Sequence, residues 1–215
     1  MKLETKPEGY FEHNRFEMIQ FIDIPISKCL DLGCGQGGYL DLLKSNFENL
    51  ETWGIEINFD SGEIAKKKGH KISIGDAEKI IDDLPDNYFD LISCNDVLEH
   101  FINPFIILEK LKTKLSNNGR IISSLPNVRY YKVMFEYVFK GDWIYREAGV
   151  MDKTHFRFFT KKSIERMYYD AGYQVIVNKG INKGKSLKPH LINIFSIFTM
   201  DDIKYPQFAT DVKKY

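Results

Sequence analysis

Short apolar runs alternate with segments of helical hydrophobic spacing over the first 125 residues of the chain. The spacing predicts a helix after each of the first four apolar runs, the first beginning near Tyr39. Strands joined by helical crossovers pair in parallel, so the pattern predicts an α/β fold built on a parallel sheet. The predicted strands are 28–32, 52–57, 70–75, 89–94 and 120–125.

The helix after the fourth strand has the clearest boundary signals. Asn103 is placed to cap it, Pro104 to occupy its first position, and 117–119 (Asn-Asn-Gly) to end it. Helical spacing then predicts the stripe that faces the sheet. Its members are Phe105, Leu108, Leu111 and Leu115.

The alternation stops after Pro126 and resumes at Thr160. The interval 126–159 contains ten of the 30 aromatic residues of the chain, about twice its share. Thr160 is placed to cap a further helix that ends at Gly172, followed by a strand at 173–177. An apolar segment at 191–198 and a last strand near 207–212 complete the predicted elements.

Composition limits the class of protein without naming it. A chain of 215 residues suggests one domain, 1–215, and its 30 Lys and Arg balance 30 Asp and Glu, which argues against a nucleic-acid binder recognised by charge. No run of 18 apolar residues predicts a membrane span, and no signal segment is evident, so we expect a cytoplasmic protein. Three cysteines without CxxC spacing predict neither disulfides nor a zinc site.

A glycine-rich turn follows the first strand, in the sequence Asp31-Leu32-Gly33-Cys34-Gly35-Gln36-Gly37-Gly38. Ligands of such sheets bind at the carboxyl ends of the strands, where glycine allows close approach to the backbone. The turn satisfies GxGxxG, which alone also fits NAD binding or a purely structural turn. Asp31 argues against NAD, because a carboxylate there would repel a pyrophosphate.

Acidic residues follow the two neighbouring strands as well. Glu56 ends the second strand, where a carboxylate can accept hydrogen bonds from both hydroxyls of a ribose. Asp76 follows the third strand, where it can accept from an adenine amino group or simply cap a helix.

These segments together resemble the class I S-adenosylmethionine-dependent methyltransferases. The matching motifs cover 28–125 in order: the glycine turn, Gly54-Ile55-Glu56-Ile57, Gly75-Asp76-Ala77, and Phe89-Asp90-Leu91-Ile92-Ser93-Cys94-Asn95-Asp96-Val97-Leu98-Glu99-His100. The resemblance implies a Rossmann-like seven-stranded sheet of order 3-2-1-4-5-7-6, with strand 7 antiparallel and helices on both faces. It also implies S-adenosylmethionine as methyl donor and S-adenosylhomocysteine as product.

The resemblance assigns cofactor-binding roles to individual positions. Within the glycine turn, the methionine portion falls to Asp31, Gly33, Cys34, Gly35 and Gly37. The ribose falls to Glu56, the adenine to Ile57, Asp76 and Ala77, and the ammonium end to the backbone around Asn95. Arg15, near Tyr10 and His13, could pair with the methionine carboxylate or lie on a solvated surface.

The acceptor class is suggested by the end of the fourth strand. Nucleobase amino-methylating enzymes carry an Asn/Asp-Pro-Pro-aromatic tetrad that is absent here, whereas Leu98-Glu99-His100 resembles small-molecule O-methyltransferases of the ubiquinone-biosynthesis type. A hydroxyl acceptor needs a base, and we expect His155 to serve, with His100 as the alternative or as a structural residue. A binding protein without activity and an RNA methyltransferase remain alternatives.

The interval 126–159 is predicted to form an aromatic lid over the methyl donor, or to pair two subunits as a homodimer. Leu125-Pro126-Asn127-Val128-Arg129 and Asp152-Lys153-Thr154-His155-Phe156-Arg157-Phe158-Phe159-Thr160 resemble methyltransferases of cell-surface polysaccharide synthesis, which loosely implies a sugar-like acceptor. Four lysines near 179–188 could meet a nucleotide sugar. We expect no metal, although Asp96 and Asn127 could hold one.

Overall fold

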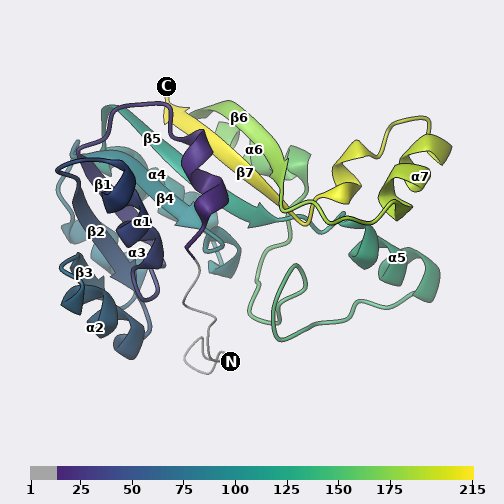
Figure 1. Ribbon diagram of the computed structural model, residues 1–215, viewed down its shortest axis with the longest axis horizontal. Coiled ribbons are helices and arrows are strands. Elements are labelled where there is room, and N and C mark those ends of the chain that lie inside the picture. The colour runs from purple at the N-terminus through teal and green to yellow at the C-terminus, as the bar shows by residue number, and fades with distance from the viewer. Residues whose placement is uncertain (1–13) are drawn as a thin grey trace.

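The computed structural model describes residues 14–215, and its seven strands form one sheet (Figure 1). The order β3-β2-β1-β4-β5-β7-β6 confirms the predicted topology. β1 to β5 pair in parallel, and β7 runs antiparallel to both β5 and β6. The strands are β1 (Lys28–Leu32), β2 (Glu51–Glu56), β3 (Lys71–Ile74), β4 (Phe89–Asn95), β5 (Leu115–Pro126), β6 (Tyr173–Ile181) and β7 (Gln207–Lys214).

Helices connect the strands as the spacing predicted. The α-helices are α1 (Gly38–Asn46), α2 (Phe59–Lys67), α3 (Ala77–Ile80), α4 (Pro104–Lys114), α5 (Tyr131–Lys140), α6 (Lys161–Asp170) and α7 (Lys188–Phe195). The short 3₁₀ helices are η2 (Phe16–Phe21), η3 (Ile81–Asp83), η4 (Leu98–His100) and η5 (Asp201–Lys204). Within the described residues, no helix is long and apolar enough to span a membrane.

Hydrophobic side chains form two cores, one on each face of the sheet. Consecutive side chains of a strand point to opposite faces. Leu30 therefore packs in the core that holds α4 and α6 residues such as Leu111 and Tyr168. Its neighbour Cys29 packs with η2 and α1 instead. Helices thus cover both faces, with η2 in front of the sheet and α6 behind it in Figure 1.

The helix α4 begins as predicted but ends earlier. The Asn103 side chain accepts a hydrogen bond from the Phe105 N–H, and Pro104 occupies the first turn. The end predicted at 117–119 is wrong, because the chain enters β5 at Leu115, which pairs with Phe89. The predicted stripe is also wrong at Phe105, which is 37% exposed. The buried face of the helix consists of Ile107, Leu108 and Leu111.

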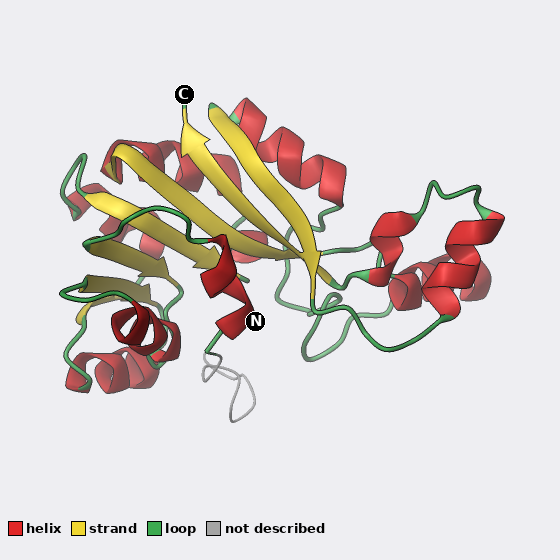
Figure 2. Ribbon diagram, turned by 45° about the horizontal axis from the view of Figure 1, so that its top comes forward, coloured by secondary structure: helices red, strands yellow, loops and turns green. Residues whose placement is uncertain are grey.

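The insertion after β5 divides into a protruding helix and a loop that returns to the sheet. Figures 1 and 2 both show α5 beside α7, away from the strands. The rest of the insertion runs back toward the carboxyl ends of β4 and β5 and holds Asp152 and His155 in buried positions. Its rings pack on one another, as Trp143 does on Tyr137 and on Phe158.

Candidate active site

A cavity of about 440 Å³ opens at the carboxyl ends of β1, β2 and β4. This is the edge at which ligands of open α/β sheets bind, and the volume lies within the range of small-molecule sites. The returning loop of the insertion and the N-terminal segment around Arg15 complete the wall. Of the predicted site residues, the cavity is lined by Arg15, Asp31, Gly33, Cys34, Gly35, Glu56, Ile57, Asn95, His100 and His155.

Backbone hydrogen bonds and the Glu56 carboxylate fix the conformation of the glycine turn. The Gly33 N–H donates to the Ile55 carbonyl at 2.8 Å. The Glu56 carboxylate accepts from the Gly35 N–H through one oxygen and from the Asn58 N–H through the other, both at 2.8 Å. Burial raises the pKa of Glu56 above its ordinary value. A Cβ on Gly33 would stand 3.0 Å from Val97 Cγ2, so the narrow wall there favours glycine.

Asp31 is a buried carboxyl at the base of the cavity. Ser93 Oγ donates to its Oδ1 at 2.5 Å. Burial raises the pKa of Asp31 to about 7, and the nearby charge of Glu56 contributes in the same direction. Two carboxyl groups therefore line one wall of the cavity. Such a wall attracts a cationic ligand and repels a phosphate, which argues against NAD as the sequence did.

The N-terminal segment contributes a cation to the cavity. The Arg15 guanidinium forms an ion pair with Asp96, and this pair lies at the end of β4. Beside it lie the buried Asn95 amide and the buried Tyr39 hydroxyl, which neighbour each other and make no other hydrogen bond of ordinary geometry with the described residues. Buried polar groups normally have partners, so these two are available to a ligand of the cavity. Tyr10 and His13 lie outside the described residues.

Three predicted cofactor positions lie outside the cavity lining. Gly37 caps α1 with a left-handed backbone, φ 79°. Asp76 caps α3 by accepting from the Glu78 N–H at 3.0 Å, the capping role that the sequence also allowed. Ala77 is the first residue of that helix. The contact of Gly37 with the methionine portion and of Asp76 and Ala77 with adenine stays a prediction, whereas Ile57, 48% exposed, does line the cavity.

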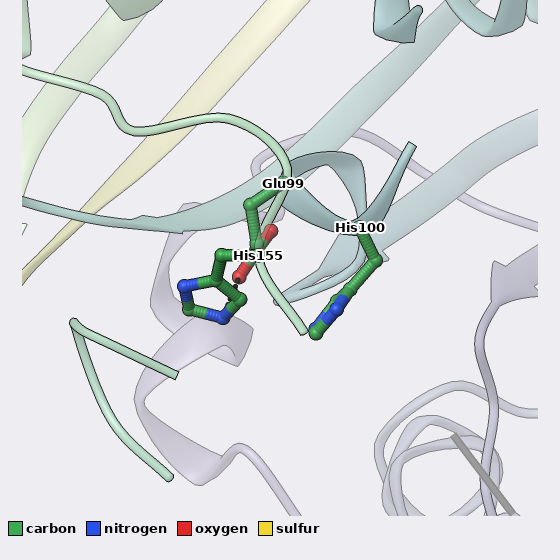
Figure 3. A group of neighbouring side chains, drawn as sticks. All are labelled: Glu99, His100 and His155. Atoms are coloured by element: carbon green, nitrogen blue, oxygen red, sulfur yellow. Dashed lines mark ion pairs between the residues drawn. The ribbon is translucent and has the colours of Figure 1, made fainter. Parts of the chain in front are cut away.

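Both predicted histidines reach the cavity, and they meet there with Glu99 (Figure 3). The rings of His100 and His155 lie edge to face, with centroids 4.8 Å apart. His155 Nε2 stands 3.8 Å from Glu99 Oε1. Glu99 is fully buried and receives no hydrogen bond from the described residues. Burial raises its pKa to about 8, against the lowering effect of the Arg15 charge.

The segment from Asp152 to Thr160 holds this cluster in place. Asp152 Oδ1 accepts from the Thr154 N–H and hydroxyl at 2.8 and 2.7 Å. The Thr154 carbonyl in turn lies 3.1 Å from His100 Nδ1. The Phe156 N–H donates to the Glu99 carbonyl, and the Arg157 guanidinium donates to the Ile102 carbonyl. The distinctive motif of the insertion is therefore a clamp that joins the loop to η4.

The aromatic lid predicted over the donor is not what lines the cavity. The insertion contributes Ala148, Gly149, Val150, Asp152 and His155 to the wall, and none of its phenylalanine, tyrosine or tryptophan rings. Those rings pack the insertion internally or lie exposed on α5, which is the alternative that the composition left open.

Like Tyr39, Glu99 is a cavity residue that the sequence prediction missed. Its position beside His100 in the Leu-Glu-His motif was the available signal. Its burial beside His155, 56 positions later, could not be predicted from the sequence. The Asp96 carboxylate pairs with the Arg15 guanidinium, and the Asn127 side-chain oxygen accepts from the Arg129 N–H. The Asn127 amide donates to the carbonyls of Asp202 and Tyr205, and the lysines of 179–188 lie outside the cavity lining.

Residues 9–177 match the sequence family described as a methyltransferase domain. The chain belongs to this family. It is a class I methyltransferase domain, and S-adenosylmethionine is its cofactor. The predicted family, fold class and cofactor are therefore confirmed, while the assignment of individual site residues stays a prediction.

Solved structures and curated relatives place the chain more broadly. It resembles a SAM-dependent methyltransferase from Archaeoglobus fulgidus, with TM-score 0.71 and 20% identity over 92% of this chain and 91% of that one. A ubiquinone biosynthesis O-methyltransferase from Actinobacillus pleuropneumoniae is 31% identical over 53% of each protein. An (S)-tetrahydroprotoberberine N-methyltransferase from Eschscholzia californica is 22% identical over 53% of this chain and 34% of its own length. The chain thus spans between a third and about half of the length of these two curated relatives.

The cavity fits the cofactor by its own chemistry. S-adenosylmethionine carries an ammonium and a sulfonium, which are complementary to the carboxyl groups of Asp31 and Glu56. The neighbouring Asn95 amide and Tyr39 hydroxyl have capacity for further hydrogen bonds, and the Arg15 guanidinium offers a cation for a carboxylate.

Proposed function

We propose that the chain transfers the methyl group of S-adenosylmethionine to a hydroxyl of a small acceptor. The observation that carries this proposal is the cluster of Glu99, His100 and His155 in the wall of the cofactor cavity. A hydroxyl oxygen must lose its proton as it becomes methylated, whereas a neutral amine attacks through a lone pair that it already has. A proton-accepting cluster beside the methyl donor therefore favours oxygen as the acceptor atom.

His155 is oriented to accept that proton. Its Nδ1 lies 3.2 Å from the Val150 carbonyl, which can only accept a hydrogen bond. In the neutral imidazole Nδ1 therefore carries the hydrogen, and Nε2 keeps the lone pair on the side of Glu99. The bound cofactor supplies an electrophilic methyl group, and the residues of the chain hold the acceptor and remove its proton.

The sugar-like character of the acceptor rests on weaker support. It comes from the resemblance of the Asp152–Thr160 motif, whose observed role is to hold His100 and His155. The curated relatives include both O- and N-methyltransferases, so methyl transfer to a small amine is the second candidate function.

The test is a screen with methyl-labelled S-adenosylmethionine and paired acceptors that differ only in a hydroxyl or an amine. We expect label in the hydroxyl compounds. His155→Ala should lower turnover by about 10²–10⁴-fold, the range for loss of a general base, without changing the affinity for S-adenosylhomocysteine. His190→Ala, on α7, is the matched control. Label only in amines, or full turnover by His155→Ala on the true acceptor, would contradict the proposal.

A further inference from the structure

We infer that Glu99, His100 and His155 form a binding site for one divalent transition-metal ion of the Zn²⁺ type. Each side chain offers one ligand atom, and the three atoms lie within 4.8 Å of one another. Metal–ligand bonds of about 2.0–2.2 Å require the ligand atoms of one ion to stand roughly 3.5 Å apart, so binding needs only a small inward rotation of the side chains.

The surroundings of the two imidazoles match those of metal ligands. A ligating histidine usually donates its second ring N–H to a carbonyl or carboxylate, which fixes the ring and leaves the other nitrogen for the metal. His155 Nδ1 faces the Val150 carbonyl at 3.2 Å. His100 Nδ1 faces the Thr154 carbonyl at 3.1 Å. Both rings are therefore held at Nδ1, and Nε2 of each is the ligand atom.

The burial of the Glu99 carboxyl favours a bound cation at this position. Its carboxyl is fully buried, and its oxygens receive no hydrogen bond from the described part of the chain. A buried carboxylate is unfavourable unless a cation or hydrogen-bond donors compensate it. Figure 3 shows Glu99 directed at His155, with His100 beside the pair. A divalent ion among the three would replace the proton of the Glu99 carboxyl and stabilise its ionised form.

The donor set indicates the class of ion. Two imidazole nitrogens and one carboxylate oxygen suit divalent first-row transition metals such as Zn²⁺ and Fe²⁺. Mg²⁺ and Ca²⁺ instead prefer sites made of oxygen ligands. Three protein ligands leave at least one coordination position toward the cavity, which all three residues line.

The role of the ion, though not its binding, rests on the proposed function. When it binds the ion, His155 Nε2 cannot also accept the proton of the acceptor. The ion would then replace the histidine base by lowering the pKa of an acceptor hydroxyl that reaches it, and the proton would pass to water. The ion would also join the insertion to η4, because His155 belongs to the insertion and the other two ligands to η4.

The experiment measures binding without any acceptor. The full-length chain, freed of metal with a chelator, is dialysed against Zn²⁺ or Co²⁺, and bound metal is counted by mass spectrometry, with the Co²⁺ visible spectrum as a second readout. We expect one equivalent per chain and a higher melting temperature. His155→Ala, His100→Ala and Glu99→Gln should each weaken binding by about 100-fold or more.

Two controls keep the result decisive. His190→Ala removes a histidine of α7 and should leave metal binding unchanged. Binding of S-adenosylhomocysteine shows that each variant is folded. The inference is overturned if the wild-type chain binds no Zn²⁺ or Co²⁺, or if the three folded variants bind as the wild type does. Neither result bears on whether a hydroxyl or an amine is methylated, which the acceptor screen decides.

Discussion

Individual carboxyl groups define the chemistry of this cavity. Asp31, Glu56 and Glu99 are all buried, and burial raises the pKa of each. Perturbed carboxyl groups that share one cavity are typical of functional sites, because each is held where its charge is unfavourable without a ligand. Asp31 and Glu56 stand at the ends of β1 and β2, where we expect the cofactor to bind, and Glu99 stands with the two histidines in the same cavity wall.

Glu56→Ala is expected to weaken cofactor binding by about 1.5–3 kcal/mol, the range for a hydrogen bond to a charged group. The substitution also removes the acceptor for the Gly35 and Asn58 N–H groups, so the glycine turn loses its support. Calorimetric titration with S-adenosylhomocysteine measures the change. Asp76→Ala is the matched control and should lose less, because Asp76 lies outside the cavity lining. Unchanged affinity in a folded Glu56→Ala variant would refute the ribose assignment.

At the scale of elements, the site depends on how each strand passes into the next helix. β1 enters α1 through a turn with three left-handed glycines, Gly33, Gly35 and Gly37. This backbone admits a ligand where an ordinary side chain would stand. On the other side, η4 and the clamp of the insertion bring residues 99 and 155 together.

Gly37→Ala should destabilise the chain by about 1–3 kcal/mol. The backbone at Gly37 is left-handed, with φ +79°, and a Cβ would stand 2.9 Å from His70 Cδ2. His70 is buried between Thr52 and Asp41, so it has little room to move. Denaturant unfolding measures the loss. Gly69→Ala separates the two causes, because its φ is +86° but nothing lies within 4 Å of a Cβ there. Equal losses in both variants would show that packing on His70 contributes nothing.

In the whole molecule, the region around the cavity differs from the protruding helices α5 and α7 in how its apolar side chains are buried. The cofactor end is packed against both cores, whereas α5 and α7 protrude with exposed apolar side chains such as Phe139 and Phe195, at 72% and 87% exposure. Exposed apolar patches of this kind often mark interaction surfaces. The homodimer through the aromatic insertion stays a prediction, which sedimentation measurements can address.

The stability of the cofactor-free chain should fall as the pH rises from about 4 to about 7. Burial raises the pKa of Asp31 to about 7 from an ordinary 3.8, so the folded state binds this proton more tightly than the unfolded state does. The contribution of Asp31 to stability is therefore greatest below its unfolded pKa, is lost through this window, and is constant above it. Glu99, whose pKa is raised to about 8, extends the fall above pH 7. The loss from Asp31 should be roughly 4 kcal/mol, since each tenfold change in proton affinity corresponds to about 1.4 kcal/mol.

Asp31→Asn isolates this contribution. The amide oxygen still accepts from Ser93 but cannot ionise, so the variant should be more stable than the wild type at pH 8 and about equal to it at pH 4. Thermal unfolding at both pH values provides the measurement. Glu56 also titrates with a raised pKa, so part of the slope should remain. If the two unfolding curves run parallel from pH 4 to pH 8, Asp31 is not the cause.

Local signals in the sequence predicted the elements: alternating apolar runs specify the strands, caps and glycines specify the turns, and parallel crossovers bring the strand ends to one edge. The order of the seven strands and the identity of the cofactor came from the family resemblance of the motifs in 28–125, and the roles of individual cofactor residues stay predictions. The early end of α4 was missed because pairing of Leu115 with Phe89 overrides the local turn signal at 117–119.

The contact between His155 and Glu99 could not be predicted from the sequence. His155 and Glu99 are 56 residues apart, and they meet because Asp152, Thr154 and the Phe156 N–H fold the insertion back onto η4. The aromatic residues of the insertion could likewise pack on one another, stack on a substrate or pair two subunits, and composition alone does not distinguish these roles. Contacts between distant segments depend on the balance of packing and hydrogen bonds over the whole fold, which no local pattern in the chain encodes.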